Sequence, residues 1–476
     1  MPQGQGFRRT KIVATLGPAS TSERVLTDII RAGVDVVRIN SSHGQPASWA
    51  PWMDQVREIA AQQGRYVAIL VDLQGPRIRV GALPEPLELL KGASVVFAPE
   101  GEAQPGEIPT TYGALAQDLQ PDSCILLDDG LIAVDVTGVA ENRAHGVVLH
   151  GGVLRSHKGI NLPGVQVSAP AVTETDRRSL AVALEHGADM IGVSFVRRAD
   201  DLEAVRALVQ SHVQVVAKIE KAAALDDLER ILEASDALMV ARGDLGVELP
   251  YEEVPLAQKR VIALANRRAR PVITATQMLE SMVHKPRPTR AEASDVANAI
   301  LDGTDAVMLS AETAVGEYPV EAVQAMARII SEMERSVSIE RQPQRRRSDA
   351  QAALGTPTVA DAIAFATSVA AELLAVPVIV CFTKSGFTAR RIAAHRPAVP
   401  IVGLSTEVAT CRYLSLVWGT IPLLAERAPT YEAMLGKARE LLAAEGLVEP
   451  GDRIVVTAGV PFDVPGTTNL LKVETI

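Results

Sequence analysis

The chain has few cysteines, no long apolar run and no excess of basic residues, and each shortage excludes a class of protein. Its three cysteines, Cys124, Cys381 and Cys411, are far apart and form no CxxC pair, so neither a zinc site nor a disulfide framework is expected. No stretch approaches the roughly 18 consecutive apolar residues of a membrane span. The segment Met1–Thr10 lacks the apolar core of a signal peptide. We therefore expect a soluble, cytoplasmic protein.

Charge and length narrow the classes further. Lysine and arginine together number 47 and aspartate and glutamate 57, which gives a net charge of -10. That balance argues against a polyanion such as nucleic acid as the main partner. A local basic run, Arg341–Arg347 within the segment Glu340–Asp349, is interpreted as a solvated linker in preference to a nucleic-acid patch. At roughly 100 to 200 residues per domain, a chain of 476 residues should form about two to four domains.

Short apolar runs alternate with amphipathic helical segments over most of the chain, which is the pattern of βα units around a parallel sheet. The runs that predict strands are Lys11–Leu16, Asp35–Asn40, Tyr66–Asp72, Met190–Phe195, Val213–Glu220, Ala237–Ala241, Pro271–Thr276 and Ala306–Ser310. Eight βα units are typical of a TIM (β/α)8 barrel. We therefore expect an α/β fold built on such a barrel.

The alternation stops between the third and fourth runs. From Gly81 to Ser168 the sequence is rich in glycine and proline and has no long helical pattern, which predicts a small all-β domain inserted into the barrel. Helical periodicity resumes with a capping-box pattern, Thr173 followed by Asp176. After the eighth strand a helix is predicted over Pro319–Met333, and then a C-terminal α/β domain of ordinary size. The expected domains are 1–80 and 169–340 for the barrel, 81–168 for the insert and 350–476 for the C-terminal domain. The elements predicted in the last are a helix over Val359–Leu374 and strands at Val378–Cys381, Ile401–Leu404 and Arg453–Thr457.

In a βα barrel, the reacting groups lie at the carboxyl ends of the strands and in the loops that follow. Lys218 and Glu220 are two residues apart and share one face of their strand, and Asp244 follows the next strand. Other polar residues at strand ends are Thr15, Arg38, Asn40, Ser42, His43, Asp72, Arg77, Arg79, Arg242, Thr274, Thr276, Ser310 and Glu312. Such a mixture suits phosphoryl transfer, in which positioning and charge neutralisation supply most of the catalysis.

Two of these carboxylates are suited to a metal ion. Glu220 and Asp244 are hard oxygen ligands appropriate to Mg²⁺, and no His or Cys cluster competes for a softer metal. Arg38 and Arg79 are suited to clamp phosphate oxygens, and Lys218 to act on the transferring group as a point charge. For any one residue the alternative is an ion pair or helix cap within the barrel. Two rival functions are a catalytically silent, phosphate-sensing barrel and an aldolase or lyase that handles enolates with Mg²⁺.

A series of motifs runs in order along nearly the whole chain. They lie at Thr10–Ser20, Arg38–Gly44, Lys158–Gly164, Lys218–Glu220, Met239–Glu248, Ala275–Met282, Lys285–Glu292 and Ser294–Asn298. By their number and order, rather than by any single motif, the chain resembles the pyruvate kinase family. The resemblance implies Mg²⁺-dependent transfer of the phosphoryl group of phosphoenolpyruvate to ADP, which gives pyruvate and ATP in the last step of glycolysis.

The resemblance also assigns roles to matching positions. It implies that Glu220 and Asp244 hold the substrate-bound Mg²⁺, that Lys218 stabilises the phosphoryl group in flight, and that Arg38 contacts the phosphate. Backbone amides around Gly243 and Asp244, with Thr276, would hold the substrate carboxylate, and Thr276 would help relay a proton to the enolate methylene. A second Mg²⁺ would arrive with ADP. The positions implied for the nucleotide and its phosphates are Thr15, Pro18, Asn40, His43, Arg79 and Lys158.

One departure from the family pattern concerns a monovalent ion. Many pyruvate kinases need K⁺, and the matching positions here are Asn40, Ser42, Asp72 and the carbonyl of Leu73. The K⁺-dependent form reads Asp-Thr-Lys-Gly-Pro-Glu, whereas residues 72–77 read Asp-Leu-Gln-Gly-Pro-Arg. Members that work without K⁺ resemble the Leu-Gln version and carry Lys where the others carry Glu. Because a tethered guanidinium can supply the charge of the ion, the hypothesis is that Arg77 removes the K⁺ requirement; the alternative is an ordinary surface arginine.

A second candidate site lies in the C-terminal domain. Its residues follow a predicted strand and precede a predicted helix, where hydroxyls and amides can cradle a phosphate: Thr383, Lys384, Ser385, Gly386 and Thr388. The segment matches the family's effector-phosphate loop, which favours a phosphorylated allosteric activator over a plain strand-to-helix turn. The resemblance further implies a homotetramer.

Overall fold

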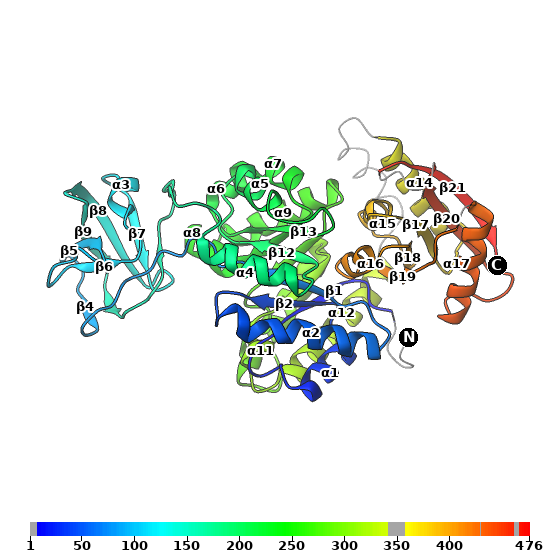
Figure 1. Ribbon diagram of the computed structural model, residues 1–476, viewed down its shortest axis with the longest axis horizontal. Coiled ribbons are helices and arrows are strands. Elements are labelled where there is room, and N and C mark those ends of the chain that lie inside the picture. Colours follow the sequence, from blue (N-terminus) through cyan, green and yellow to red (C-terminus); the bar gives the residue numbers. More distant parts are fainter. Residues whose placement is uncertain (1–6, 341–357, 429, 461–465) are drawn as a thin grey trace.

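A computed structural model of the protein describes residues 7–340, 358–428, 430–460 and 466–476. Three parts lie in a row: an inserted β-rich domain, a central barrel and a C-terminal α/β domain (Figure 1). The basic run Arg341–Arg347, interpreted above as a linker, lies outside the described residues. No helix among the described residues is both long enough and apolar enough to cross a membrane.

The central part is a closed barrel of eight parallel strands, which confirms the fold class predicted from the eight apolar runs. β1 pairs with both β2 and β16, and this closes the ring. In order around the ring the strands are β1 (Lys11–Thr15), β2 (Val36–Asn40), β3 (Ala68–Asp72), β12 (Met190–Val193), β13 (Gln214–Ile219), β14 (Ala237–Ala241), β15 (Val272–Ala275) and β16 (Ala306–Leu309). β12 ends before the predicted Phe195, since that residue has a φ of 56°, which no strand accommodates.

Helices cover the outside of the ring, and their apolar faces form one large core with the outward-facing strand residues. The capping box predicted at Thr173 and Asp176 is present, with both reciprocal hydrogen bonds. The helix predicted over Pro319–Met333 is longer than expected and reaches Glu340. The helices are α1 (Glu23–Arg31), α2 (Pro46–Gln62), α4 (Glu174–Glu185), α5 (Ala199–Arg206), α6 (Ala222–Asp226), α7 (Leu228–Ala234), α8 (Arg242–Glu248), α9 (Val254–Arg267), η1 (Glu280–Val283), α10 (Arg290–Asp302), α11 (Ala311–Ala314) and α12 (Pro319–Glu340).

An aspartate immediately precedes every second strand at the amino end of the barrel. These residues are Asp35, Asp189, Asp236 and Asp305. Each carboxylate accepts a backbone N–H of the neighbouring strand at 2.7 to 3.0 Å; the donors are Ile12, Ile69, Val215 and Val272. Each also pairs with an arginine at 2.5 to 2.9 Å; these are Arg8, Arg57, Arg206 and Arg396. The amino end is therefore closed by a repeated set of satisfied ion pairs.

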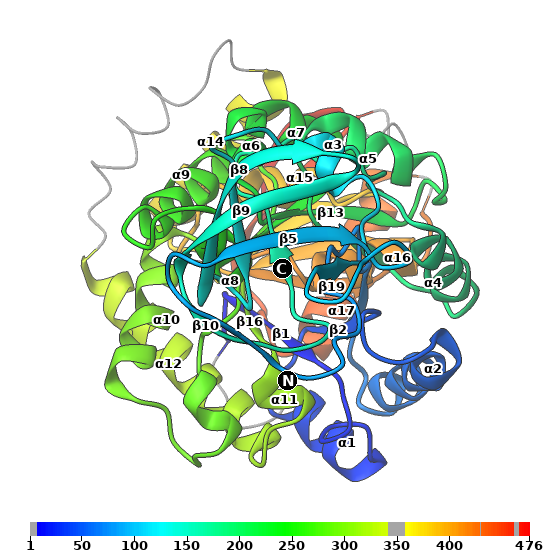
Figure 2. The ribbon, with the colours of Figure 1, turned by 90° about the vertical axis from the view of Figure 1, so that its left-hand side faces the viewer.

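The inserted domain leaves the barrel after β3 and returns before α4. Its strands are β4 (Leu87–Leu89), β5 (Ser94–Pro99), β6 (Ile108–Thr110), β7 (Cys124–Leu127), β8 (Ile132–Ala140), β9 (Arg143–His150), β10 (Gly152–Leu154) and β11 (Ile160–Asn161). Six of them form one sheet in the order β11-β7-β8-β9-β5-β6 over a separate apolar core. The single-turn helix α3 (Leu115–Asp118) is an addition to the all-β prediction. Seen from this side, β5, β8 and β9 lie across the end of the barrel (Figure 2).

The C-terminal domain is a five-stranded sheet with helices, in the order β19-β18-β17-β20-β21, and only β21 runs antiparallel to its neighbour. β19 and β21 were not expected from the sequence. The elements are α14 (Val359–Leu373), β17 (Ile379–Phe382), α15 (Phe387–Ala393), β18 (Ile401–Ser405), α16 (Val408–Leu414), β19 (Thr420–Leu424), α17 (Tyr431–Ala444), β20 (Arg453–Gly459) and β21 (Thr468–Thr475).

The C-terminal domain closes the amino end of the barrel. Tyr413 and Leu416 belong to the same buried apolar cluster as the inward-facing barrel residues. The Tyr413 hydroxyl donates to the carbonyl of Asp236 at 2.9 Å, and Nζ of the buried Lys11 donates to the carbonyl of Thr420 at 2.8 Å. The barrel thus has a floor made by another domain, and its opposite, carboxyl end faces the inserted domain (Figure 1).

Candidate active site

Charged side chains from three barrel strands meet at the carboxyl end, where the sequence placed them. Asp72 ends β3 and accepts from Arg38 of β2, at 2.9 Å from Nε and 2.6 Å from Nη2. Nζ of Lys218, from β13, lies 3.1 Å from Asp72 Oδ2 and 2.7 Å from Glu220 Oε1. All four side chains are almost entirely buried. We call Arg38, Asp72, Lys218 and Glu220 the central ion cluster.

The charges of the central ion cluster shift one another's protonation. Burial opposes the charged form of Lys218, but Asp72 and Glu220 outweigh it and raise the pKa of the ammonium. Burial likewise acts against ionised Asp72, yet Lys218 and Arg38 hold its pKa below the ordinary value. For Glu220 burial prevails over Lys218, and its pKa is raised. At neutral pH the site therefore holds a fixed ammonium, on Lys218, and a carboxylate, on Glu220, whose ionised form would be stabilised by an added cation.

A serine that the sequence analysis did not single out connects the cluster. The Ser194 hydroxyl accepts from Lys218 Nζ at 2.7 Å and lies 2.7 Å from the carbonyl oxygen of Leu73 and 3.3 Å from Asp72 Oδ1. Next to it, the backbone N–H of Phe195 donates to Glu220 Oε2 at 2.8 Å. Both residues follow β12. The sequence could have pointed to Ser194, because it is a hydroxyl-bearing residue at the end of a predicted strand.

Asp244 and Glu220 are the carboxylates proposed for Mg²⁺. Asp244 lies in the first turn of α8; its side chain is exposed and makes no ion pair with the described residues. Its negative charge contributes to the raised pKa of Glu220, so the two carboxylates repel each other in the absence of a cation. The described residues contain no group of three or more His, Cys, Asp or Glu side chains suited to a metal. This donor set fits a Mg²⁺ that arrives with substrate oxygens, because Mg²⁺ needs only one or two protein carboxylates.

Thr276 follows β15 in an unusual backbone conformation. Its φ is 63°, and that of Gln277 is 53°; a positive φ at a β-branched residue costs on the order of 1 to 3 kcal/mol. The Thr276 hydroxyl accepts from the backbone N–H of Gly243 at 2.8 Å and donates to the carbonyl of Ala275 at 2.7 Å. The structure thus brings together the hydroxyl and the amide that were expected to share a substrate carboxylate.

The positive charges of three arginines act on His43 at the mouth of the barrel. Burial first, and then the charges of Arg77, Arg38 and Arg79, lower the pKa of His43. Burial and Arg79 also lower the pKa of Arg77, while Asp244, Glu220 and Asp72 act in the opposite direction. The Arg77 and Arg79 guanidinium groups have no ion-pair partner among the described residues. The rim is therefore an unneutralised positive region beside the carboxylates.

The remaining predicted nucleotide and ion positions lie around the same mouth, with one exception. Thr15 is buried and its hydroxyl accepts from Arg38 Nη1 at 3.2 Å, and Pro18 is exposed. Asn40 Oδ1 accepts the backbone N–H of Ser42 at 3.2 Å. The exception is Lys158, whose Nζ lies 2.7 Å from Asp128 Oδ1 within the inserted domain.

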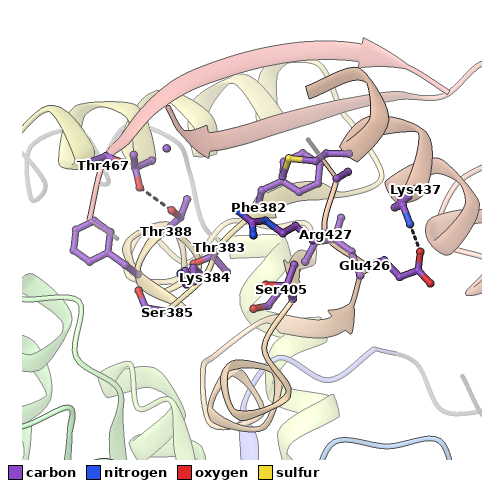
Figure 3. A pocket seen from close by; sticks show the side chains of 18 of the residues that line it. Phe382, Thr383, Lys384, Ser385, Thr388, Ser405, Glu426, Arg427, Lys437 and Thr467 are labelled. Atoms are coloured by element: carbon purple, nitrogen blue, oxygen red, sulfur yellow. Dashed lines mark hydrogen bonds and ion pairs between the residues drawn. The ribbon is translucent and has the colours of Figure 1, made fainter. Parts of the chain in front are cut away.

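The C-terminal candidate segment lines a pocket. It is lined by Thr383, Lys384 and Ser385 from the turn between β17 and α15 and by Thr388 from the first turn of α15, which Gly386 caps at a φ of 77°. The other lining residues include Ser405, Thr406, Glu426, Arg427, Lys437, Thr467 and Thr468. Figure 3 shows Lys384 and Ser385 on one side and Lys437, paired with Glu426, on the other. The Thr388 hydroxyl lies 2.7 Å from that of Thr468.

Comparisons with known proteins agree over nearly the whole chain. A family model described as pyruvate kinase, barrel domain, matches residues 7–323, and one described as pyruvate kinase, alpha/beta domain, matches residues 361–474. The pyruvate kinase of Geobacillus stearothermophilus is 45% identical over 98% of this chain and 80% of its own length. That of Sporosarcina psychrophila is 43% identical over 99% and 81%. A crystal structure of a Cryptosporidium parvum pyruvate kinase matches with a TM-score of 0.92 and 32% identity, over 98% of this chain and 96% of that one.

Proposed function

The chain belongs to the pyruvate kinase family, and from this premise we propose how its residues carry out the reaction. As a phosphotransferase of this family it has phosphoenolpyruvate, ADP, pyruvate and ATP as substrates and products. The observation that carries our assignment is the placement of Lys218: its ammonium is buried, is held by Asp72, Glu220 and Ser194, and has a raised pKa. A cation so fixed is positioned to stabilise charge on a transferring phosphoryl group.

Contacts in the same region support the other proposed roles. Arg38, oriented by two hydrogen bonds to Asp72, binds the phosphate, and the rim arginine Arg79 binds phosphates on the nucleotide side. Glu220 and Asp244 hold Mg²⁺, which when bound neutralises phosphate oxygens during transfer. A second Mg²⁺ comes with ADP.

The carboxyl end of the substrate is assigned to the neighbouring loop. The Gly243 and Asp244 amides and the Thr276 hydroxyl hold the substrate carboxylate. The hydroxyl of Thr276, which accepts from one group and donates to another, can give its proton to a neighbouring water and regain one from a second water connected to solvent. That proton goes to the enolate methylene through water once the phosphoryl group has left.

A coupled assay of pyruvate formation from phosphoenolpyruvate and ADP tests the assignment. We expect Lys218→Ala to lower kcat by roughly 10² to 10³-fold. The matched control is Lys221→Ala, because Lys221 is a nearby lysine paired with Glu248 at 2.6 Å that has no proposed role. If the unmodified protein makes no ADP-dependent pyruvate, the proposal of an active kinase is refuted. The alternatives are then the catalytically silent, phosphate-sensing barrel and the aldolase or lyase that handles enolates with Mg²⁺.

We further propose that the reaction needs no K⁺. Support comes from the rim: Arg77 has no ion-pair partner among the described residues, and its charge acts on Asp72, Glu220 and Asp244. Two of the matching ion positions are already engaged, since Leu73 O accepts from Ser194 and Asp72 Oδ2 from Arg38 and Lys218. The test compares rates in K⁺ and in a quaternary ammonium buffer free of Na⁺ and K⁺.

The Arg77→Glu variant sharpens that test. We expect equal rates in both buffers for the unmodified protein and a K⁺ requirement in the variant, because Glu would add a negative charge that a monovalent ion must offset. A strict K⁺ requirement in the unmodified protein would refute the proposal.

The C-terminal pocket is proposed to bind a phosphorylated activator. Lys384, the hydroxyls of Thr383 and Ser385, and the amide at Gly386 offer the donors that a phosphate requires. Titration with several sugar phosphates and nucleotides should shift substrate saturation in the unmodified protein but not in Lys384→Gln. The control is Lys472→Gln, since Lys472 lies on β21 and pairs with Glu474 at 3.3 Å. Unchanged saturation with every candidate would count against an effector site.

The domain division, assembly and location complete the proposal. We assign 1–80 and 169–340 to the barrel, 81–168 to a lid that brings Lys158 to the nucleotide, and 350–476 to the effector and assembly domain. Lid closure would require Lys158 to leave Asp128, and it would exclude water from the mouth. We propose a cytoplasmic homotetramer, which sedimentation analysis tests.

A further inference from the structure

Arg242 donates hydrogen bonds to the backbone of the two residues with positive φ in the candidate active site, Thr276 and Gln277. Its guanidinium donates to three successive backbone carbonyls: from Nε to Ala275 at 3.2 Å, and from Nη2 to Thr276 at 2.7 Å and Gln277 at 3.2 Å. Two of those carbonyls belong to the two residues with positive φ. A left-handed Thr persists only where its surroundings over-determine it, and this guanidinium supplies several of the bonds that do so.

The arginine is itself held in place. Its Nη1 lies 2.7 Å from the Asp295 carboxylate, and its side chain is 11% exposed. Asp295 belongs to α10, and the capping-box residue Glu292 of the same helix accepts from the backbone N–H and hydroxyl of Ser281, at 2.7 and 2.6 Å. Helix α10 therefore fixes both ends of the loop that follows β15.

We propose that Arg242, oriented by Asp295, is a positioning residue for the Thr276 hydroxyl. The planar fork is essential, because only a guanidinium can donate to several diverging carbonyls and one carboxylate at once, whereas a lysine ammonium lacks that fixed geometry. The same clamp sets the place of the Gly243 amide, since that N–H donates to the Thr276 hydroxyl. This inference rests on the role proposed above for Thr276.

The first test is Arg242→Lys, which keeps the charge and removes the fork. We expect kcat for pyruvate formation to fall about 100-fold, the effect typical of a misplaced reacting group. Arg57→Lys is the matched control: Arg57 donates to the carbonyls of Val67 and Gly187 and to Asp189, but at the amino end of the barrel. It should lose thermal stability and keep its kcat.

A double-mutant cycle separates positioning from a general structural role. Adding Arg242→Lys to Thr276→Ala should cost less than about 3-fold in kcat, since the hydroxyl to be positioned is already absent. A loss near 100-fold in both backgrounds would overturn the proposal, as would an Arg242→Lys protein with unchanged kcat.

Two further measurements test the proposal if the Arg242→Lys variant does not fold. Asp295→Asn leaves Arg242 in place and should lower kcat by about 10-fold with unaltered circular dichroism, because the fork loses only its orienting charge. Arg242→Ala should regain part of its activity on addition of guanidinium ion at millimolar concentration, whereas Arg57→Ala should not respond. Absence of both effects in folded proteins would overturn the clamp, while inactivity of the unmodified enzyme would instead overturn the proposed function.

Discussion

The two ends of the barrel use the same residue types for opposite purposes. At the amino end each of four aspartates accepts a backbone N–H and pairs with an arginine, so the buried charges are satisfied within the protein. At the carboxyl end Asp244, Arg77 and Arg79 have no ion-pair partner among the described residues. Buried charge that is fully compensated maintains the fold, and charge left incomplete marks where a ligand completes it.

The largest expected effect is a loss of stability when an aspartate at the amino end is removed. Asp35 forms ion pairs with Arg8 at 2.6 Å and with Arg65 at 3.4 Å, and it accepts a hydrogen bond from the backbone N–H of Ile12. Asp35→Ala leaves these partly buried cations without a carboxylate partner, so we expect a loss of about 3 to 5 kcal/mol in the free energy of unfolding, with kcat preserved in the folded protein. Urea titration measures it. Asp54→Ala, at an exposed residue, serves as the control and should change stability by less than about 0.5 kcal/mol.

Glu220→Gln should have the converse effect at the carboxyl end. We expect kcat to fall roughly 10² to 10³-fold and Mg²⁺ to bind more weakly, while the melting temperature is unchanged or higher, because burial already disfavours the charged form of this side chain. Kinetics over a Mg²⁺ titration and a thermal melt give the answer. A strongly destabilised variant would mean that Glu220 is structural, like the aspartates at the other end.

As the pH is lowered, the function of the carboxyl end should be lost before the stability that the amino end provides. The pKa of Asp35 is lowered against the opposing effect of burial, by Arg8, Lys11 and Arg65. Its stabilising contribution is therefore present above the unfolded-state pKa and is lost only as pH falls through the lowered folded-state value. The pKa of Glu220 is raised, so Mg²⁺ binding should weaken at a pH above the roughly 4.3 of an ordinary glutamate. We expect activity to fall before the circular dichroism signal does; the reverse order would contradict this assignment.

The smallest expected effect concerns Ser194. Ser194→Ala removes one hydrogen bond from Lys218 and one contact to Leu73 O while the two carboxylates stay in place. A single hydrogen bond of this kind is worth about 1 kcal/mol, so kcat should fall roughly 5-fold with the Mg²⁺ dependence unchanged. A loss comparable to that of Lys218→Ala would give the serine a direct role in the reaction.

Sequence reasoning predicted the ring of strands because alternating apolar runs are local features, and it placed Lys218, Glu220 and Asp72 at one end because parallel strands share their polarity. It missed Ser194 and the function of Arg242, whose roles depend on contacts between strands distant along the chain. It also missed β19 and β21. β21 contains alternating charged and apolar residues and pairs antiparallel at the edge of the sheet, where half-exposed strands give a weak signal.

The floor formed by Tyr413 and Leu416 has a consequence for biosynthesis. All eight barrel strands have been synthesised by residue 309, yet the interior apolar cluster that they enclose is completed only by residues made about a hundred positions later. Until then a nascent barrel would expose Val13, Met239 and their neighbours through its open end, the kind of apolar surface that chaperones retain. A chain that stops before α16 should accordingly aggregate, although it contains every residue of the candidate active site.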